Sequence, residues 1–141
     1  MERNTRQRTC VLNEVRGRSD HPTAHEIYAA VRKKLPNISL TTVYRNLTDL
    51  ADDGLILRIA VPGSSERFDR TVKIHFHMLC DNCHGFSDIS DDGHFFDIIR
   101  ESVEKSDGFF VSGMDVVLRG TCADCIRKEN DKDKDKDKAK I

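Results

Sequence analysis

Two Cys-x-x-Cys pairs constrain this sequence more than any other feature. Cys80 and Cys83 form the first pair, Cys122 and Cys125 form the second, and 38 residues separate them. Zn²⁺ prefers four soft ligands in a tetrahedron, and each Cys-x-x-Cys places two thiolates on one side of the ion. The sequence therefore predicts one structural zinc that ties two distant segments together. The alternatives are free thiol pairs or one redox-active pair, but no βαβ pattern typical of thioredoxin-like motifs surrounds them.

The polar N-terminal stretch bears on the compartment. Residues 1–6 lead into no apolar segment, so we expect no secretory signal and predict a cytoplasmic location. In a reducing compartment, clustered cysteines indicate metal or redox chemistry before disulfides. The fifth cysteine, Cys10, is expected to be a small buried residue of the first helix. No apolar run approaches the roughly 18 residues of a membrane-spanning helix, so we expect no membrane partner.

Charge is divided unevenly along the chain. Residues 1–60 hold ten Lys or Arg against seven Asp or Glu, whereas residues 61–141 hold thirteen against seventeen. The balances of +3 and −4 return the net charge of −1. A basic front half and an acidic back half suggest two parts with different partners, although this asymmetry alone does not demonstrate nucleic-acid binding.

Helical spacing and capping signals predict three helices in the front half. Apolar residues at helical spacing predict the first over 6–16. Thr23 and Glu26 have the spacing of a capping box, in which each side chain bonds the other residue's backbone N–H, and they open the second. Ser39 is the expected N-cap of a third, amphipathic helix, and Gly54 is its expected left-handed C′ residue.

A hairpin is expected to follow these helices. Residues 55–61 alternate enough to form a strand, and after a Pro-Gly turn residues 66–69 are expected to return beside it. Three helices followed by a hairpin constitute a winged-helix arrangement. The sequence therefore predicts a winged helix over residues 1–63, with the wing extending to about residue 69.

The back half is predicted to be a small α/β domain over residues 70–130, which makes the whole chain α+β. After this domain, Asp and Lys alternate strictly at 131–138. This pattern predicts a disordered, solvated tail over 131–141, because such a segment buries too little apolar area to offset its ordering entropy. The expected elements are strand 74–80, helix 94–105, strands 109–111 and 114–119, and a short helix 123–129.

A second group of candidate ligands consists of His21, Asp69, His75, His77 and Asp88. His75 and His77 are two residues apart on a predicted strand, so both imidazoles project from one face. A five-coordinate N/O site without thiolate suits Fe(II) or Mn(II) better than a structural zinc. On the residues alone, a polar sheet face is an equally good interpretation. His21 joins the group only if the front half folds against the back half.

The exposed face of the third predicted helix carries Thr42, Tyr44 and Arg45. On a winged-helix recognition helix, Arg reads guanine N7 and O6, and Tyr packs on a thymine methyl. Without the fold context, a solvated helix face is the better interpretation.

Several of these stretches, taken in order, resemble the ferric uptake regulator (Fur) superfamily of metal-responsive repressors. The resemblance extends from about Thr5 to Lys128. Its order and spacing are specific, and it favours the functional interpretation of both the His/Asp group and the helix face. The stretches that carry it are Asp-His-Pro-Thr-Ala at 20–24, Thr-Val-Tyr-Arg-Asn-Leu at 42–47, Arg-Phe-Asp at 67–69, His-Phe-His-Met-Leu-Cys-Asp-Asn-Cys at 75–83, and Gly-Thr-Cys-Ala-Asp-Cys at 120–125.

The resemblance implies a DNA-binding winged helix, an α/β dimerisation domain and a two-fold homodimer on double-stranded operator DNA. It implies one zinc per chain at the four paired cysteines and one regulatory Fe(II) or Mn(II) per chain at the five His and Asp residues. It also implies DNA contacts by Thr42, Tyr44 and Arg45.

The subfamily is indicated by Asp69 and Asp88, where iron-uptake regulators usually carry Glu and the peroxide-sensing branch (PerR) carries Asp. Ile74 and Phe76 stand where many iron-uptake regulators place ligands of a third site, and no extra cysteine of the kind that zinc-uptake regulators use as a ligand lies near this region. We therefore predict a peroxide-sensing repressor in which a metal-catalysed reaction oxidises the ligand histidine His21 or His75. The alternative is an iron- or manganese-responsive uptake regulator.

The same residues are also compatible with an enzyme, which is the alternative to a DNA-binding regulator. An N/O metal site suits an oxygenase or a hydrolase, and the Cys-x-x-Cys pairs suit a thiol oxidoreductase. We expect neither, because no general base stands out beyond the ligands and the chain is short. Peroxide, as a signal, is the one small molecule that we expect the protein to meet.

Overall fold

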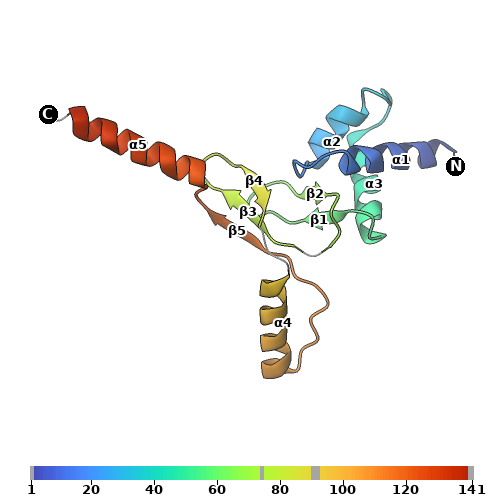
Figure 1. The fold of residues 1–141 in the computed structure, drawn as a ribbon. Helices are drawn as coiled ribbons and strands as arrows, with labels where there is room; N and C mark the ends of the chain where they lie inside the picture. The colour runs from blue at the N-terminus through green and yellow to red at the C-terminus, as the bar shows by residue number, and fades with distance from the viewer. Residues whose placement is uncertain (1, 74, 90–92, 140–141) are drawn as a thin grey trace. The chain divides into compact units, whose positions relative to one another are not determined.

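The computed structural model describes residues 2–73, 75–89 and 93–139, and it divides into two units, residues 1–74 and 75–141 (Figure 1). The division follows residue 74, whereas the sequence predicted it after residue 69. The α+β fold class is as predicted: helices and a small wing sheet come first, and a mixed α/β unit follows. No helix among the described residues is long and apolar enough to cross a membrane.

The first unit consists of three helices and a hairpin. Its helices pack around one apolar core, to which the three helices and the strand β2 contribute. The core side chains are Val11, Val15, Ile27, Val31, Ile38, Val43, Leu47, Leu50, Ile56 and Phe68. The elements are α1 (Glu2–Arg16), α2 (Ala24–Val31), α3 (Leu40–Asp52), β1 (Leu57–Ile59) and β2 (Arg67–Asp69).

The predicted helix caps are present. Thr23 caps α2 with a complete capping box with Glu26, and the Ser39 hydroxyl accepts a hydrogen bond from the backbone N–H of Thr42 at the start of α3. Gly54 follows α3 with a φ of 74°, a left-handed conformation that glycine adopts without strain. Cys10 lies in α1 and packs against the core, but it is half-buried rather than buried as predicted.

The hairpin is bound to the loop that precedes α2. β1 and β2 are antiparallel, with Leu57 opposite Asp69. The Phe68 N–H donates to the Pro22 carbonyl, and Thr23 forms a bridge with Arg67. Phe68 is fully buried in the core. These contacts fix β2 beside the chain at residues 21–23, so that the wing and this loop form one layer.

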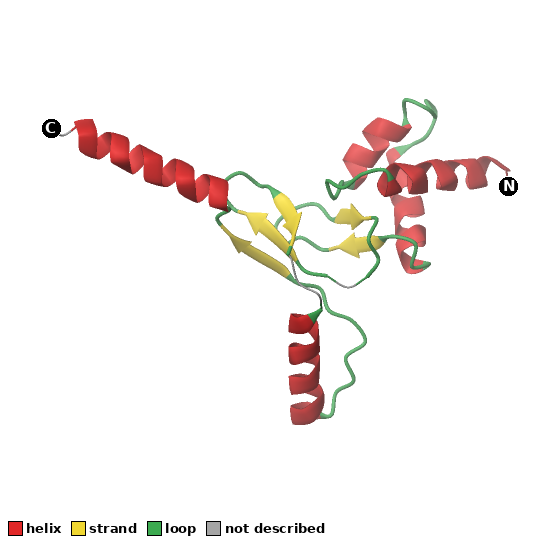
Figure 2. Ribbon diagram, in the orientation of Figure 1, coloured by secondary structure: helices red, strands yellow, loops and turns green. Residues whose placement is uncertain are grey.

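The second unit has a three-stranded sheet in the order β4-β3-β5. β3 pairs antiparallel with β4 and parallel with β5, and Cys80 at the end of β3 lies opposite Gly120. Figure 2 shows this sheet between two helices that extend away from it. The elements are β3 (His77–Cys80), β4 (Phe86–Asp88), α4 (His94–Asp107), β5 (Val117–Gly120) and α5 (Ala123–Ala139).

The strand predictions for this unit were partly wrong. β3 begins at His77 rather than at residue 74, which lies outside the described residues, and β4 was not predicted. The predicted strand 109–111 does not form, and the next strand is 117–120 rather than 114–119. Phe109 and Phe110 are instead 64% and 80% exposed. A strand needs a partner for its backbone groups, and no other strand of the described chain pairs with this segment.

The Asp-Lys tail, predicted to be disordered over 131–141, is helical in the structure as far as Ala139, where α5 ends. Helix nucleation is the costly step, and the first turn of α5 contains the buried Cys125, whose contacts offset part of that cost. Once started, the helix brings Asp131 near Lys134 and Asp133 near Lys136 at i, i+3 spacing, which favours propagation.

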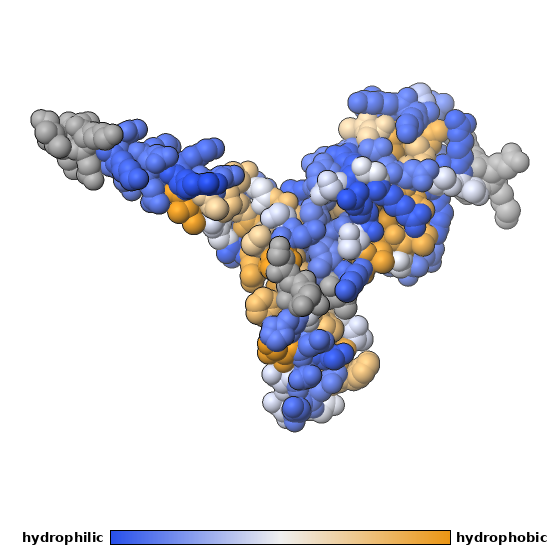
Figure 3. Space-filling view, in the orientation of Figure 1, coloured by the Kyte–Doolittle hydropathy of each residue, from blue (hydrophilic) through white to orange (hydrophobic). Residues whose placement is uncertain are grey.

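Exposed apolar side chains set the second unit apart. The helix α4 has no buried residue, although Phe95, Ile98 and Ile99 lie on it. Figure 3 shows hydrophobic residues reaching the surface over α4, whereas the outer part of α5 is hydrophilic. The buried apolar side chains of this unit, among its described residues, are Phe76, Cys80 and Cys125.

Candidate functional site

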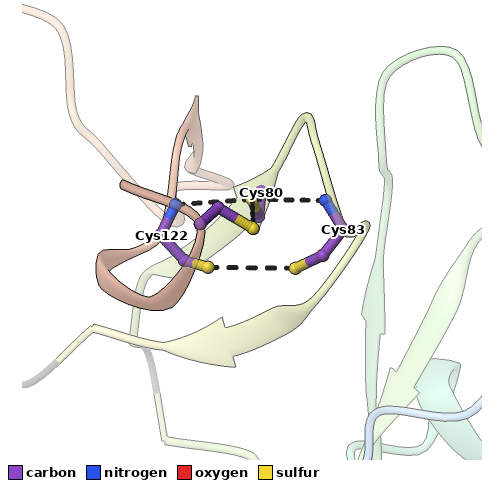
Figure 4. Close-up of side chains that lie close together, drawn as sticks. Cys80, Cys83 and Cys122 are labelled. Atoms are coloured by element: carbon purple, nitrogen blue, oxygen red, sulfur yellow. Dashed lines mark hydrogen bonds between the residues drawn. The ribbon is translucent and has the colours of Figure 1, made fainter. Parts of the chain in front are cut away.

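Four thiols converge where the sheet of the second unit ends. Cys80 closes β3, Cys83 follows it in a tight turn, and Cys122 and Cys125 lie at the start of α5. The Cys80 and Cys125 sulfurs are 3.8 Å apart, and so are those of Cys83 and Cys122. Figure 4 shows the side chains of Cys80, Cys83 and Cys122 pointing toward one another. These separations exclude disulfides, whose S–S bond is about 2.05 Å.

The cluster has the geometry of a tetrahedral metal site. All four sulfurs lie within 4.8 Å of one another. A tetrahedron with Zn–S bonds of about 2.3 Å has edges of roughly 3.8 Å, which is the separation found in both pairs. Four thiolates are also the soft donor set of structural zinc. The donors present therefore fit this ion, with Cys80 and Cys125 buried and Cys83 exposed.

Backbone N–H groups stabilise one thiolate of the cluster. Cys83 and Cys122 each donate a backbone N–H to the Cys80 sulfur, at 3.5 and 3.3 Å, and these bonds lower the pKa of Cys80 to about 6. A hydrogen bond with Asn82 lowers the pKa of Cys125, but Cys122 and burial raise it more, to about 12. A cation that takes the Cys125 sulfur as a thiolate must therefore displace its proton.

A buried His-Asp pair lies in the first unit. His21 Nε2 is 3.2 Å from Asp69 Oδ2, and both side chains are buried. His21 has a φ of 52°, which is uncommon for a residue other than glycine. Arg67 Nη1 donates to the His21 carbonyl, and the Thr71 N–H donates to the Asp69 carboxylate. The wing strand β2 thus holds both side chains in place.

The second unit carries two histidines on one carboxylate. His75 Nε2 and His77 Nε2 lie 3.3 and 3.2 Å from the same oxygen of Asp88. The β3–β4 register creates this arrangement, since His77 lies opposite Asp88. His75 precedes β3, yet the two imidazole centroids are only 4.4 Å apart. The buried His77 also stacks on Phe86. The five predicted N/O ligands are therefore distributed as two in one unit and three in the other.

The three predicted DNA-contact residues lie on α3. Thr42 supports the helix start, because its N–H and its hydroxyl both bond Ser39. Tyr44 and Arg45 are exposed. Within the described part of the chain, the Arg45 guanidinium has no ion-pair partner, so its charge is available to an anionic ligand. Val43, Leu47 and Leu50 on the opposite side of α3 are buried in the core.

Comparison with known proteins decides the family. Residues 2–118 match the ferric uptake regulator family. This chain belongs to the Fur family. The predicted family resemblance is thereby confirmed, and as a member of this family the protein is a metal-dependent transcriptional regulator and not an enzyme.

Several relatives within the Fur family are named as peroxide regulators. The peroxide operon regulator of Bacillus subtilis is 35% identical over 126 residues, covering 89% of this chain and 86% of that protein. The peroxide-responsive repressor PerR of Staphylococcus epidermidis is 32% identical, covering 89% and 83%. Among solved structures, a Campylobacter jejuni peroxide stress regulator is 34% identical with a TM-score of 0.73, covering 87% of this chain and 91% of that chain.

One cluster of side-chain contacts in the winged helix was not predicted from the sequence. Arg58 of β1 bonds both Glu66 and the hydroxyl of Tyr44. No motif signals such a cluster, because its members are 14 and 8 residues apart and belong to different elements. The Arg67 bond to the His21 carbonyl was missed for the same reason.

Proposed function

We propose that this protein is a homodimeric, peroxide-sensing repressor that binds double-stranded operator DNA in the cytoplasm. One observation carries the proposal: aspartates, not glutamates, accompany the histidines in both N/O groups, Asp69 beside His21 and Asp88 beside His75 and His77. The peroxide-sensing branch has Asp at both positions. The names of the relatives agree with this interpretation.

The four thiols hold one structural Zn²⁺ per chain in this proposal. The tetrahedral sulfur separations support it. The ion would connect the end of β3 to the start of α5, and its binding free energy would contribute to folding. The exposed apolar side chains of α4 and Phe109–Phe110 support a dimer, because a second copy of the unit would cover them.

The regulatory ion, Fe(II) or Mn(II), is held by His21, Asp69, His75, His77 and Asp88 in this proposal. Imidazole and carboxylate donors without thiolate suit these ions. Each group is already arranged around an aspartate, at Nε2–Oδ separations of 3.2 to 3.3 Å. Closing the two groups on one ion would favour the arrangement in which the α3 helices of the dimer meet successive major grooves. A ligand shifts such an equilibrium only by its preference for one state.

The signal is proposed to act on a ligand histidine. Ferrous iron held by these residues would catalyse the cleavage of the O–O bond of hydrogen peroxide. In the net reaction the imidazole gives up two electrons and gains one oxygen atom, and the other oxygen leaves as water. The expected target is His21 or His75. An oxidised imidazole is a poorer ligand, so the regulatory site opens and operator binding is lost. With Mn(II), DNA binding is expected to persist in peroxide.

The test is operator binding by the wild type and by His21→Ala, with Mn(II), with Fe(II) and without either. We expect metal-dependent binding by the wild type and its loss in His21→Ala, which keeps zinc and the dimer. His94→Ala changes an exposed histidine of α4 and is the matched control. Operator binding by the wild type that is equally strong with and without Mn(II) or Fe(II) would contradict the proposal. Metal-dependent binding that persists with Fe(II) in peroxide would favour an iron- or manganese-responsive regulator.

A further inference from the structure

One arginine on the wing joins three elements of the first unit. Arg58 lies on β1, Tyr44 on α3, and Glu66 just before β2. The Nη2 of Arg58 donates to the Tyr44 hydroxyl at 3.0 Å and to Glu66 Oε1 at 2.8 Å. The Nε of Arg58 donates to the other oxygen of Glu66. The guanidinium carbon lies 5.8 Å from the centroid of the Tyr44 ring.

This geometry fixes the orientation of the guanidinium. A planar guanidinium that meets both oxygens of one carboxylate has its plane and direction set, which a lysine ammonium cannot reproduce. Held in this way, Arg58 contacts both the face and the hydroxyl of Tyr44. Tyr44 is 42% exposed, so without these contacts its side chain would be free to change rotamer in solvent.

The charges of the cluster point to orientation rather than phosphate attraction. Glu66 neutralises Arg58, and its hydrogen bond with Arg58 holds the pKa of Glu66 below the usual value. The nearby Arg45 guanidinium, by contrast, has no ion-pair partner in the described part of the chain. The two arginines therefore differ: Arg45 offers a free charge, and Arg58 offers a fixed hydrogen-bond geometry.

We infer that Arg58 is a positioning residue for DNA reading, that it holds Tyr44 in its base-contacting rotamer, and that Glu66 holds Arg58. The inference rests on the proposed DNA-binding function and on Tyr44 touching bases. A conformation that is fixed before binding avoids the ordering cost of a free side chain. Arg58 thus acts on specificity through Tyr44, without itself contacting a base.

The test is sequence selection from a library of randomised duplex DNA by the Mn(II)-loaded protein. Tyr44→Ala identifies the base positions that Tyr44 reads. Arg58→Lys keeps the positive charge but loses the planar guanidinium that bonds both oxygens of Glu66. Tyr44→Phe removes only the hydroxyl, and Glu66→Gln removes the charge of the carboxylate. Arg32→Lys is the matched control, because Arg32 lies 5.6 Å from the ring of Tyr28 in a separate Arg-Tyr pair.

We expect Arg58→Lys and Tyr44→Phe each to reduce base preference roughly fivefold, the equivalent of one hydrogen bond, and only at the Tyr44 positions. The double variant should lose no more than either single variant, because both remove the same interaction. Glu66→Gln should weaken the same positions and strengthen binding to unselected DNA. Arg32→Lys should change nothing.

Three results would overturn the inference. Arg58→Lys could leave every base preference unchanged, or it could alter positions that Tyr44→Ala does not. A further variant, Arg58→Ala, removes the charge. If it lost affinity equally for all DNA sequences, and if the dependence of its affinity on salt concentration fell by about one in slope, Arg58 would be a phosphate contact. If the wild type with Mn(II) selects no sequence at all, the proposed function fails first, and the positioning role fails with it.

Discussion

The two units of the protein are stabilised by different means. The first unit buries ten apolar side chains in one core, to which three helices and a hairpin contribute. The second unit has three buried apolar side chains among its described residues, and two of them are cysteines of the thiol cluster. Its helix α4 buries none. The first unit therefore has the core of an independent domain, and the second depends on what binds its thiols and covers its apolar surface.

In the proposed function, this difference matches a division of tasks between a unit that reads DNA and a unit that senses and assembles. A reader of DNA needs a rigid helix face, and a hydrophobic core beneath α3 supplies it. A sensing and assembly unit gains from depending on ligands, because its folding free energy then includes their binding free energy. We expect perturbations of the second unit to act through zinc and association, and perturbations of the first to act through packing.

The largest effect is expected from loss of zinc. Cys80→Ser removes one of the four thiolates, and structural zinc contributes about 10 kcal/mol or more in small zinc domains. The second unit should unfold and the dimer should dissociate, while the first unit remains folded. Zinc content, sedimentation and calorimetry measure the three properties. Cys10→Ser is the control and should retain zinc and dimer. A stable Cys80→Ser dimer would contradict the zinc assignment.

Truncation of a side chain in the core of the first unit should destabilise that unit and leave the zinc site unchanged. Leu47 is fully buried on α3, and Leu47→Ala should lower the free energy of unfolding of the first unit by about 2–5 kcal/mol. Zinc content should not change. Calorimetry should show only the zinc-independent transition moving to lower temperature. If both transitions moved together, the two units would not be independently stabilised.

Association should respond to α4 with a smaller effect. Ile98 is 48% exposed on this helix. Ile98→Asp places a charge where the proposed partner copy would cover it, and we expect the dimer dissociation constant to rise at least roughly tenfold. Glu104→Gln, on the opposite side of α4, is the control. Sedimentation at several concentrations measures both, and equal dimers in both variants would exclude α4 from the interface.

The smallest effect concerns pH and the wing. The hydrogen bond from Arg58 lowers the pKa of Glu66 below its model-compound value of 4.5. The pair therefore adds stability above that value, and this contribution is lost as the pH falls through the lowered pKa. We expect wild type and Glu66→Gln to differ in the unfolding temperature of the first unit at pH 7 and to converge toward pH 3. A difference that grows on acidification would contradict this coupling.

The sequence predicted the winged helix well, because its signals are local. Thr23, Glu26, Ser39 and Gly54 mark helix ends by hydrogen bonds and backbone angles that depend on near neighbours. The paired cysteines were likewise recognisable from spacing, and the structure brings their sulfurs together.

The sheet of the second unit was harder to predict because its pairing is not local. The strand at 109–111 was predicted from β-favouring residues, yet nothing in the described chain pairs with it. β4 was missed because Phe86–Asp88 is short and its apolar alternation is weak. The Tyr44–Arg58–Glu66 cluster depends on how α3 meets the hairpin, which no spacing in the sequence reveals.

The central claim is that peroxide oxidises a ligand histidine of this protein when the regulatory site holds Fe(II). The most direct test is peptide mass spectrometry of the Fe(II)-loaded and Mn(II)-loaded dimers after brief exposure to low peroxide. We predict one added oxygen atom on His21 or His75 with Fe(II), none with Mn(II), and none on the exposed His25, His84 and His94 in either case. Unmodified His21 and His75 in an iron-loaded protein, or equal oxidation of all the histidines, would contradict the claim.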